Sequence, residues 1–203
     1  LDGELPSVVP TMTKAEYCHA VEVAKEHILA GDIFQVVLSQ RYDFTLKADS
    51  FDVYRVLRQT NPSPYMYYVR HDEVTLVGCS PEPMVQVLGD RVVSRPIAGT
   101  RARGQSEEED RKLAAELREH PKEVAEHVML VDLARNDLGR VSRFGTLEID
   151  EMMTLENYSH VMHLTSQISG KLREEKTPID VIKATFPAGT VSGAPKVRAM
   201  EII

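Results

Sequence analysis

Two glutamates three residues apart lie in a long, uninterrupted helical pattern. Pro121 fits the first turn of a helix, and neither Gly nor Pro follows it before Gly139. On that helix Glu123 and Glu126 fall on one face, which they share with apolar residues further along, Leu130, Leu133 and Ala134. Carboxylate oxygens suit Mg²⁺, which commonly takes one or two protein carboxylates and leaves its other positions to water and substrate. The pair therefore indicates a magnesium site, the alternative being that both side chains favour the helix dipole and reach solvent.

The other sides of this helix are largely apolar as well, with Val124, Val128, Met129 and Val131. We therefore predict a helix that is buried all round. Two like charges on a buried helix are costly unless a cation or a proton compensates them, which favours the metal interpretation.

Two further residues are candidates for proton transfer. Glu82 lies between Pro81 and Pro83, directly after an apolar strand pattern. A carboxyl group held there is either a positioned acid with a raised pKa or an exposed turn residue. His163 shares a strand face with Thr165 and Gln167, although a lone strand histidine is more often structural than catalytic.

Two glycine-bearing segments offer backbone amides to an anion. Residues 187–196 place Gly189 and Gly193 before a helix start, but the segment fails the Walker pattern because no Ser or Thr follows Lys196. Its N–H groups would serve a carboxylate as well as a phosphate. The polar segment 99–106 reads as a loop. Each segment is also compatible with an ordinary turn.

The elements that must position these residues are a mixture of hairpins and separate helices. Helices are predicted at 14–30, 50–59, 107–119 and 121–137, from 178 to about 187, and from about 195. Strands are predicted at 33–46, 65–70, 74–80, 84–88, 91–95, 145–150 and 159–169. This order is typical of an α+β fold with helices outside antiparallel sheets. No linker or repeat divides the chain, so we expect residues 1–203 to form one domain.

Composition excludes several classes of protein. The 203 residues carry a net charge of −7 and no basic run, which argues against a nucleic-acid binder. No apolar stretch reaches membrane-spanning length, and because no charged-then-apolar segment opens the sequence we expect no signal peptide. Cys18 and Cys79 lack metal-type spacing and indicate reduced thiols in the cytoplasm. Because the chain starts at Leu1 and stops at Ile203 within an apolar run, we expect a fragment of a longer protein.

Seven segments together resemble the chorismate-utilising enzymes, and most closely their anthranilate synthase branch. The segments are IFQVVLSQR, NPSPYMYY, GCSPEP, RPIAGTRARG, EHVMLVDLARNDLGRV, VMHLTSQISGKL and FPAGTVSGAPKVRAMEII. They run from residue 33 to residue 203. The resemblance implies an α+β fold with large antiparallel sheets, and amination of chorismate with loss of pyruvate to give anthranilate.

The resemblance also implies roles for single residues. Glu126, with Glu123 beside it, resembles the magnesium ligands that clamp the ring carboxylate of chorismate. Glu82 matches the general acid that protonates the departing ring hydroxyl, and His163 matches the histidine linked to the loss of pyruvate. Positions that match substrate contacts are Gly99, Thr100, Thr190 and Gly193. Positions that match the site for inhibitory tryptophan are Pro64, Tyr65 and Met66.

Two positions separate the branches of the family. Relatives that add water carry a lysine base where this chain has Gln35, and glutamine cannot deprotonate water, so ammonia is the better nucleophile. Aminodeoxychorismate synthases carry a nucleophilic lysine where this chain has Ala98. Aminodeoxychorismate synthase is nevertheless the alternative enzyme, and a non-catalytic module that binds tryptophan is the alternative outside catalysis.

The resemblance further implies a partner and missing parts. Ammonia would come from glutamine through an amidotransferase subunit, whether separate or fused. Compared with the family, the amino-terminal region is absent, and so is the carboxy-terminal stretch with a second metal-binding glutamate. We therefore expect these 203 residues to be inactive alone.

Overall fold

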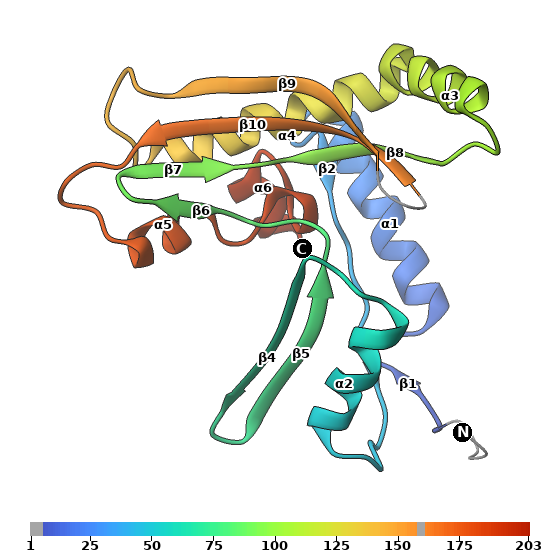
Figure 1. Ribbon diagram of the computed structural model, residues 1–203. Coiled ribbons are helices and arrows are strands. Elements are labelled where there is room, and N and C mark those ends of the chain that lie inside the picture. Colours follow the sequence, from blue (N-terminus) through green and yellow to red (C-terminus); the bar gives the residue numbers. More distant parts are fainter. Residues whose placement is uncertain (1–5, 158–160) are drawn as a thin grey trace.

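A five-stranded antiparallel sheet is the centre of the molecule (Figure 1), which is described by a computed structural model for residues 6–157 and 161–203. The central strand is β10 (Val161–Lys171), with β9 (Glu148–Asn157) on one side. On the other side β7 (Arg91–Ser94) and β8 (Ile97–Ala102) follow one another along β10, and β6 (Gln86–Leu88) extends the sheet beyond β7.

Helix α4 (Pro121–Gly139) runs along one face of this sheet (Figure 1). Its contact face packs into a core with the strands and with α5 (Pro178–Thr185). The buried residues of that core include Val92, Val131, Ala134, Leu138, Ile168 and Val181. A second, smaller core joins α3 (Glu107–Glu119) to β10 through Leu117, Met162 and Leu164. Burial of these side chains fixes α4 relative to the sheet.

Two irregularities interrupt the central ladder. Pairing jumps from His163–Thr100 to Leu164–Ala98, so Gly99 is an extra residue in β8, and its φ of 83° suits a glycine. On the opposite side of β10, pairing jumps from Thr165–Thr154 to Gln167–Glu151. The regular ladder is therefore interrupted near the middle of β10 on both of its sides.

Shorter pieces surround the sheet. Helix α1 (Lys14–Leu29) begins with a capping box and α2 (Ser50–Thr60) packs beside the hairpin of β4 (Tyr65–His71) and β5 (Val74–Ser80). The remaining elements are β1 (Val9–Pro10), β2 (Gln35–Val36), β3 (Tyr42–Asp43), the 3₁₀ turn η1 (Gly189–Val191), β11 (Gly193–Ala194) and α6 (Lys196–Ile202).

The predicted α+β class is confirmed, since every strand pair in the described ranges is antiparallel and the helices lie outside the sheets. The predicted helices are present, with ends shifted by a few residues at α4, α5 and α6. Both predicted hairpins are also present, with two-residue turns that place Asp72 and Gly89 at positive φ.

Four predictions about local structure are wrong. Residues 33–46 form only the two short strands β2 and β3, because each finds a partner strand of only two residues. Residues 99–102 are strand, not loop, because β10 supplies a ladder for them. The strand predicted at 145–150 runs from Glu148 to Asn157. By contrast, the strand predicted at 159–169 is confirmed over the described residues, since β10 runs from Val161 to Lys171, while residues 159 and 160 lie outside the described ranges.

Helix α4 is the fourth case, because it is not buried all round. Val128 is 46% exposed, while the residues that face the sheet, such as Leu130 and Leu138, are buried. The apolar residues of its outer side line a groove. No helix within the described ranges is long and apolar enough to cross a membrane.

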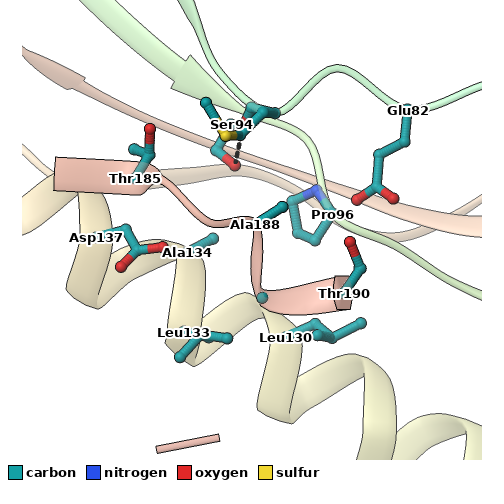
Figure 2. A pocket seen from close by; sticks show the side chains of 12 residues that line it. Glu82, Ser94, Pro96, Leu130, Leu133, Ala134, Asp137, Thr185, Ala188 and Thr190 are labelled. Atoms are coloured by element: carbon teal, nitrogen blue, oxygen red, sulfur yellow. Dashed lines mark hydrogen bonds between the residues drawn. The ribbon is translucent and has the colours of Figure 1, made fainter. Parts of the chain in front are cut away.

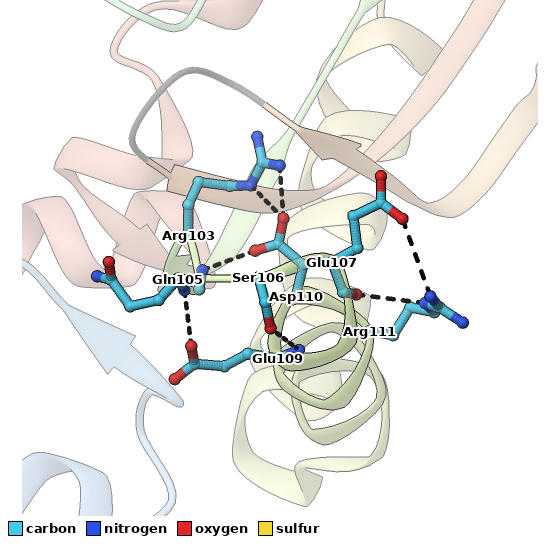
Figure 3. Close-up of polar contacts among 8 residues, drawn as sticks. Arg103, Gln105, Ser106, Glu107, Glu109, Asp110 and Arg111 are labelled. Atoms are coloured by element: carbon cyan, nitrogen blue, oxygen red, sulfur yellow. Dashed lines mark hydrogen bonds and ion pairs between the residues drawn. The ribbon is translucent and has the colours of Figure 1, made fainter.

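The segment that leads from β8 to α3 is tied down by polar contacts (Figure 3). The Asp110 carboxylate accepts hydrogen bonds from the Arg103 guanidinium and, at 2.6 Å, from the Gly104 N–H. Ser106 caps the helix by accepting from the Glu109 N–H, and Glu109 in turn accepts from the Gln105 N–H. These contacts hold the end of β8 in place and, with it, the residues around Gly99.

Candidate active site

Glu82 faces a small pocket between the sheet and α4 (Figure 2). The turn after β5 brings it there, and Ser80 closes that turn by donating from Oγ to the Glu82 carbonyl at 3.0 Å. The pocket holds about 40 Å³, which is room for one or two waters or a hydroxyl group. Its other walls come from the β7–β8 junction, from α4 and from the segment that enters η1, where Thr190 faces Glu82.

The electrostatics of this pocket favour a protonated carboxyl group. Burial raises the pKa of Glu82 above its usual 4.5, and hydrogen bonds from the Ile97 backbone and the Thr190 hydroxyl oppose this only in part. A half-buried carboxylic acid of this kind can donate a proton to a leaving group. The sequence prediction of a positioned acid with a raised pKa thus agrees with the pocket.

A buried ion pair supports the far end of the pocket. Lys196, 5% exposed, donates to the Asp137 carboxylate and, at 2.8 Å, to the Thr185 carbonyl. Burial raises the pKa of Asp137 and Lys196 opposes that shift. Because Asp137 belongs to α4 and Thr185 ends α5, Lys196 ties these two helices together at the end of α5 from which the Thr190 segment continues. Lys196, at the end of the segment that does not match the Walker pattern, therefore has a structural role as a buried cation.

Glu126 faces a separate, open groove on the other side of Leu133, which lines both spaces. The groove holds about 780 Å³, enough for a small organic ligand. Gln35 donates from Nε2 to Glu126 Oε1 at 3.4 Å, so strand β2 brings together two residues that the sequence separates widely. Gln35 Oε1 is buried and has no hydrogen-bond partner within the described ranges.

Glu123 lies one turn earlier on α4 and has other neighbours. Its Oε1 pairs with Arg101 Nη1 at 3.4 Å. A Cβ placed on Gly99 would lie 3.4 Å from Glu123 Oε2 and 3.1 Å from Leu117 Cδ1. Glycine at the β8 bulge thus permits the close approach of helix and strand.

The two carboxylates of α4 differ in how well they suit a magnesium ion. Glu126 offers oxygens of the right type, and its groove leaves room for water and substrate in the other positions. Glu123 is partly neutralised by Arg101, and no group of three metal-binding side chains occurs within the described ranges. The residues fit an ion that takes one or two protein carboxylates and relies on substrate for further ligands.

The structure places the other candidates in three groups. Thr100 Oγ1 lies 2.9 Å from His163 Nδ1, across the β8–β10 ladder. Gly193 pairs with Val36 beside Gln35, at a φ of 142°. The third group is at the start of β4, where Tyr65 and Met66 pair with Ser80 and Cys79 and exposed Pro64 precedes them. That last group lines none of the spaces that hold Glu82 or Glu126.

Sequence reasoning missed two buried polar residues, His127 and Ser166. His127 Nε2 lies 2.6 Å from Ser166 Oγ, and both residues are fully buried. Burial lowers the pKa of His127. The available signal was the spacing of Glu123 and His127, four residues apart, which puts a second polar side chain on the face predicted to meet the core.

The chain is similar to several characterised proteins. Anthranilate synthase component 1 of Aquifex aeolicus is 56% identical over 191 residues, 94% of this chain and 39% of that protein. The Thermus thermophilus protein of the same name is 57% identical over 191 residues, 94% of this chain and 41% of that protein. The crystal structure of anthranilate synthase component I from Streptococcus pneumoniae matches with a TM-score of 0.86 and 44% identity, over 98% of this chain and 44% of that one.

The chain thus spans about two fifths of the length of these relatives. Nearly the whole of this chain, residues 2–203, matches the sequence model of one protein family, described as chorismate binding enzyme. With the sheet, the helix α4 and the two adjoining spaces in place, the chain belongs to the family of chorismate-binding enzymes.

Proposed function

We propose that this chain carries part of the active site of an anthranilate synthase large subunit. The reaction joins chorismate and ammonia and gives anthranilate, pyruvate and water. The observation that carries the proposal is the pair of adjoining spaces on α4, one with an acid of raised pKa and one with an open carboxylate. Relatives with this name that are more than half identical support it.

Glu82 is proposed to donate a proton to the departing ring hydroxyl. The 40 Å³ pocket suits a hydroxyl group and not the whole substrate, whereas the 780 Å³ groove can hold the ring and its substituents. Thr190 faces Glu82 and orients its carboxyl group. The donated proton and the ring oxygen leave as water, while the nitrogen of ammonia bonds to the ring carbon ortho to the carboxylate and the two ring double bonds shift to make this possible.

Gln35 is proposed to orient ammonia. Its buried Oε1 can accept a hydrogen bond from an N–H group, while its Nε2 is held toward Glu126. A glutamine provides no base to activate water, which favours an amine nucleophile. Ala98 is buried and lacks a nucleophilic side chain, which argues against the covalent chemistry of aminodeoxychorismate synthase, the alternative enzyme.

His163 is proposed to assist the loss of pyruvate that makes the ring aromatic. Its Nδ1 is held near the Thr100 hydroxyl, which orients the imidazole toward the end of β8 that carries Gly99. When bound between Glu126 and substrate, Mg²⁺ would supply charge neutralisation for the substrate carboxylate. Glu123 would complete the acidic surroundings of that ion, with Arg101 as its partner.

Regulation and ammonia supply extend the same proposal. Pro64, Tyr65 and Met66 are proposed as contacts for inhibitory tryptophan, because β4 pairs with the strand that ends next to Glu82. An amidotransferase subunit is proposed as the source of ammonia from glutamine. A non-catalytic module that binds tryptophan would need neither the acidic pocket nor the carboxylate groove.

The test uses a hybrid, because the relatives are more than twice as long as this chain. Residues 2–203 replace the matching segment of the Thermus thermophilus protein, and anthranilate is followed by fluorescence with ammonia, chorismate and Mg²⁺. We expect turnover in the hybrid, and a loss of about 10²–10⁴-fold in kcat for Glu82→Gln with little change in KM. The isolated chain is expected to release no anthranilate above a Glu126→Ala control.

Two results would contradict the proposal. A hybrid that folds and binds chorismate but forms 4-amino-4-deoxychorismate belongs to the alternative enzyme. A Glu82→Gln hybrid with full kcat would remove Glu82 from the proton-transfer step.

A further inference from the structure

His127 is a fully buried polar residue to which the proposed reaction gives no task. It lies on the face of α4 that meets the sheet, at the level where the ladder is interrupted on both sides of β10. Buried imidazoles need hydrogen-bond partners, and His127 has one on each ring nitrogen. Its Nε2 lies 2.6 Å from Ser166 Oγ and its Nδ1 lies 3.4 Å from the Ala98 carbonyl.

The contact to Ser166 reaches the edge strand β9. Ser166 Oγ also accepts a hydrogen bond from the Met153 N–H at 2.9 Å. Met153 belongs to the irregular stretch of β9 opposite Ser166 and has a φ of 53°, unusual for a residue with a side chain. One serine hydroxyl therefore joins the helix to a strained turn of the outer strand.

The contact to Ala98 reaches the substrate side of β8. Ala98 directly precedes Gly99, the bulge residue, and the next residue is Thr100, which pairs with His163. On α4, Glu123 precedes His127 by four residues, so the two side chains share a face, and Glu123 Oε2 approaches the same glycine. His127 thus lies where the turn of α4 that carries Glu123 and Glu126 packs against the Gly99 bulge of β8.

We propose that His127 is a positioning residue, which holds the Glu123–Glu126 turn of α4 in fixed relation to the Ala98–Thr100 bulge of β8. Through Ala98 it sets the bulge, and through Ser166 it holds the two neighbouring strands. It touches no reacting atom. This inference rests on the proposed function, because the turn and the bulge are the proposed metal and substrate contacts.

The test compares two variants of His127 with a matched control in the full 203-residue chain. His127→Phe keeps the bulk and removes both polar contacts, while His127→Gln keeps an amide that can reach Ser166 Oγ. Leu138→Ala is the control, since Leu138 is fully buried on the same helix but its own side chain lines neither the Glu82 pocket nor the Glu126 groove. Thermal denaturation gives the Tm of each variant, so that losses of ligand binding are compared between variants with similar losses of stability.

Two measurements separate positioning from simple stability. Calorimetric titration with chorismate and Mg²⁺ should show about tenfold weaker binding for His127→Phe, and binding within about threefold of wild type for His127→Gln and Leu138→Ala. The ¹H–¹⁵N spectrum of the free chain should show the largest shifts of the Gly99 and Thr100 amide resonances in His127→Phe, smaller shifts in His127→Gln, which keeps the Ser166 contact, and none in Leu138→Ala.

Several results would overturn the inference. Equal loss of binding in His127→Phe and Leu138→Ala would reduce His127 to a stability role, and so would unmoved Gly99 and Thr100 amides. If the wild-type chain binds no chorismate, the titration counts against the proposed function alone. The amide resonances then decide for or against positioning by themselves, because they need no ligand.

Discussion

The two spaces on α4 differ in enclosure, although Leu133 lines both. The Glu82 pocket is small, and its walls come from the β5–β6 turn, the β7–β8 junction, α4 and the η1 segment. The Glu126 groove is some twenty times larger, about 780 Å³ against 40 Å³, and is bordered by exposed apolar side chains such as Phe34, which is 76% exposed.

This difference follows what each carboxyl group is proposed to do. An acid that must give up a proton near neutral pH needs a raised pKa, and burial supplies it at Glu82. A carboxylate that binds a cation must stay charged and must leave room for water and substrate, which an open groove allows at Glu126. One helix thus borders a pocket that holds an acid of raised pKa on one side and a candidate cation site on the other.

The largest expected effect is a loss of stability at the Glu82 pocket when the buried cation of Lys196 is removed. Lys196→Met leaves Asp137 buried without a partner, and we expect a loss of about 3 kcal/mol in the free energy of unfolding at pH 7. For a chain of this size that is a fall of roughly 10 °C in Tm, measured by circular dichroism.

A double variant tests whether the unpaired charge is the cause. Asp137→Leu combined with Lys196→Met removes both charges and should recover much of the lost stability. If the double variant is no more stable than Lys196→Met alone, the buried pair is not what holds α4 and α5 together.

At the proposed metal site, Glu126 in the open groove should matter more for binding than Glu123, which pairs with Arg101 and does not line that groove. We expect Glu126→Gln to weaken Mg²⁺-dependent chorismate binding about 100-fold, and Glu123→Gln about tenfold, because Arg101 already pairs with Glu123. Calorimetric titration with and without Mg²⁺ measures both. Glu22→Gln on the exposed face of α1 is the control and should leave binding unchanged. Equal losses for Glu126→Gln and Glu123→Gln would contradict the ranking, and losses that persist without Mg²⁺ would contradict the metal assignment.

The parts of the fold that sequence predicts well are those that local chemistry decides. The capping box of Thr13 and Glu16 marks α1, and the Gly89 turn marks the β6–β7 hairpin. The extent of residues 33–46 as strand was wrong, since strand length depends on a partner elsewhere in the chain. The prediction of a loop at residues 99–102 was wrong for the same reason. A polar stretch that contains glycine is typical of a loop, and only the pairing with β10 makes it a strand.

The candidate site follows the same division. Glu82 between two prolines and the Glu123–Glu126 pair are visible as local patterns. The contact of Gln35 with Glu126 and the pairing of Lys196 with Asp137 join residues 91 and 59 positions apart, so no local pattern predicts them. His127 was hidden for another reason: a histidine among apolar helix residues gives no sign of which strands it will meet.

The smallest expected effect concerns how the enclosure of Glu82 couples to pH. Since burial raises its pKa, the folded chain keeps a proton that the unfolded chain releases above 4.5, and stability falls as pH rises from 4.5 through the folded-state pKa. Glu82→Gln mimics the protonated form and should escape that fall. We expect equal Tm values near about pH 4 and a wild-type Tm a few degrees below that of Glu82→Gln at about pH 8. Exposed Glu16 gives the opposite sign, because the Thr13 backbone hydrogen bond lowers its pKa and its contribution is lost on acidification. A Tm difference between wild type and Glu82→Gln that is flat with pH, or that grows toward low pH, would mean that the Glu82 pocket does not bury its acid.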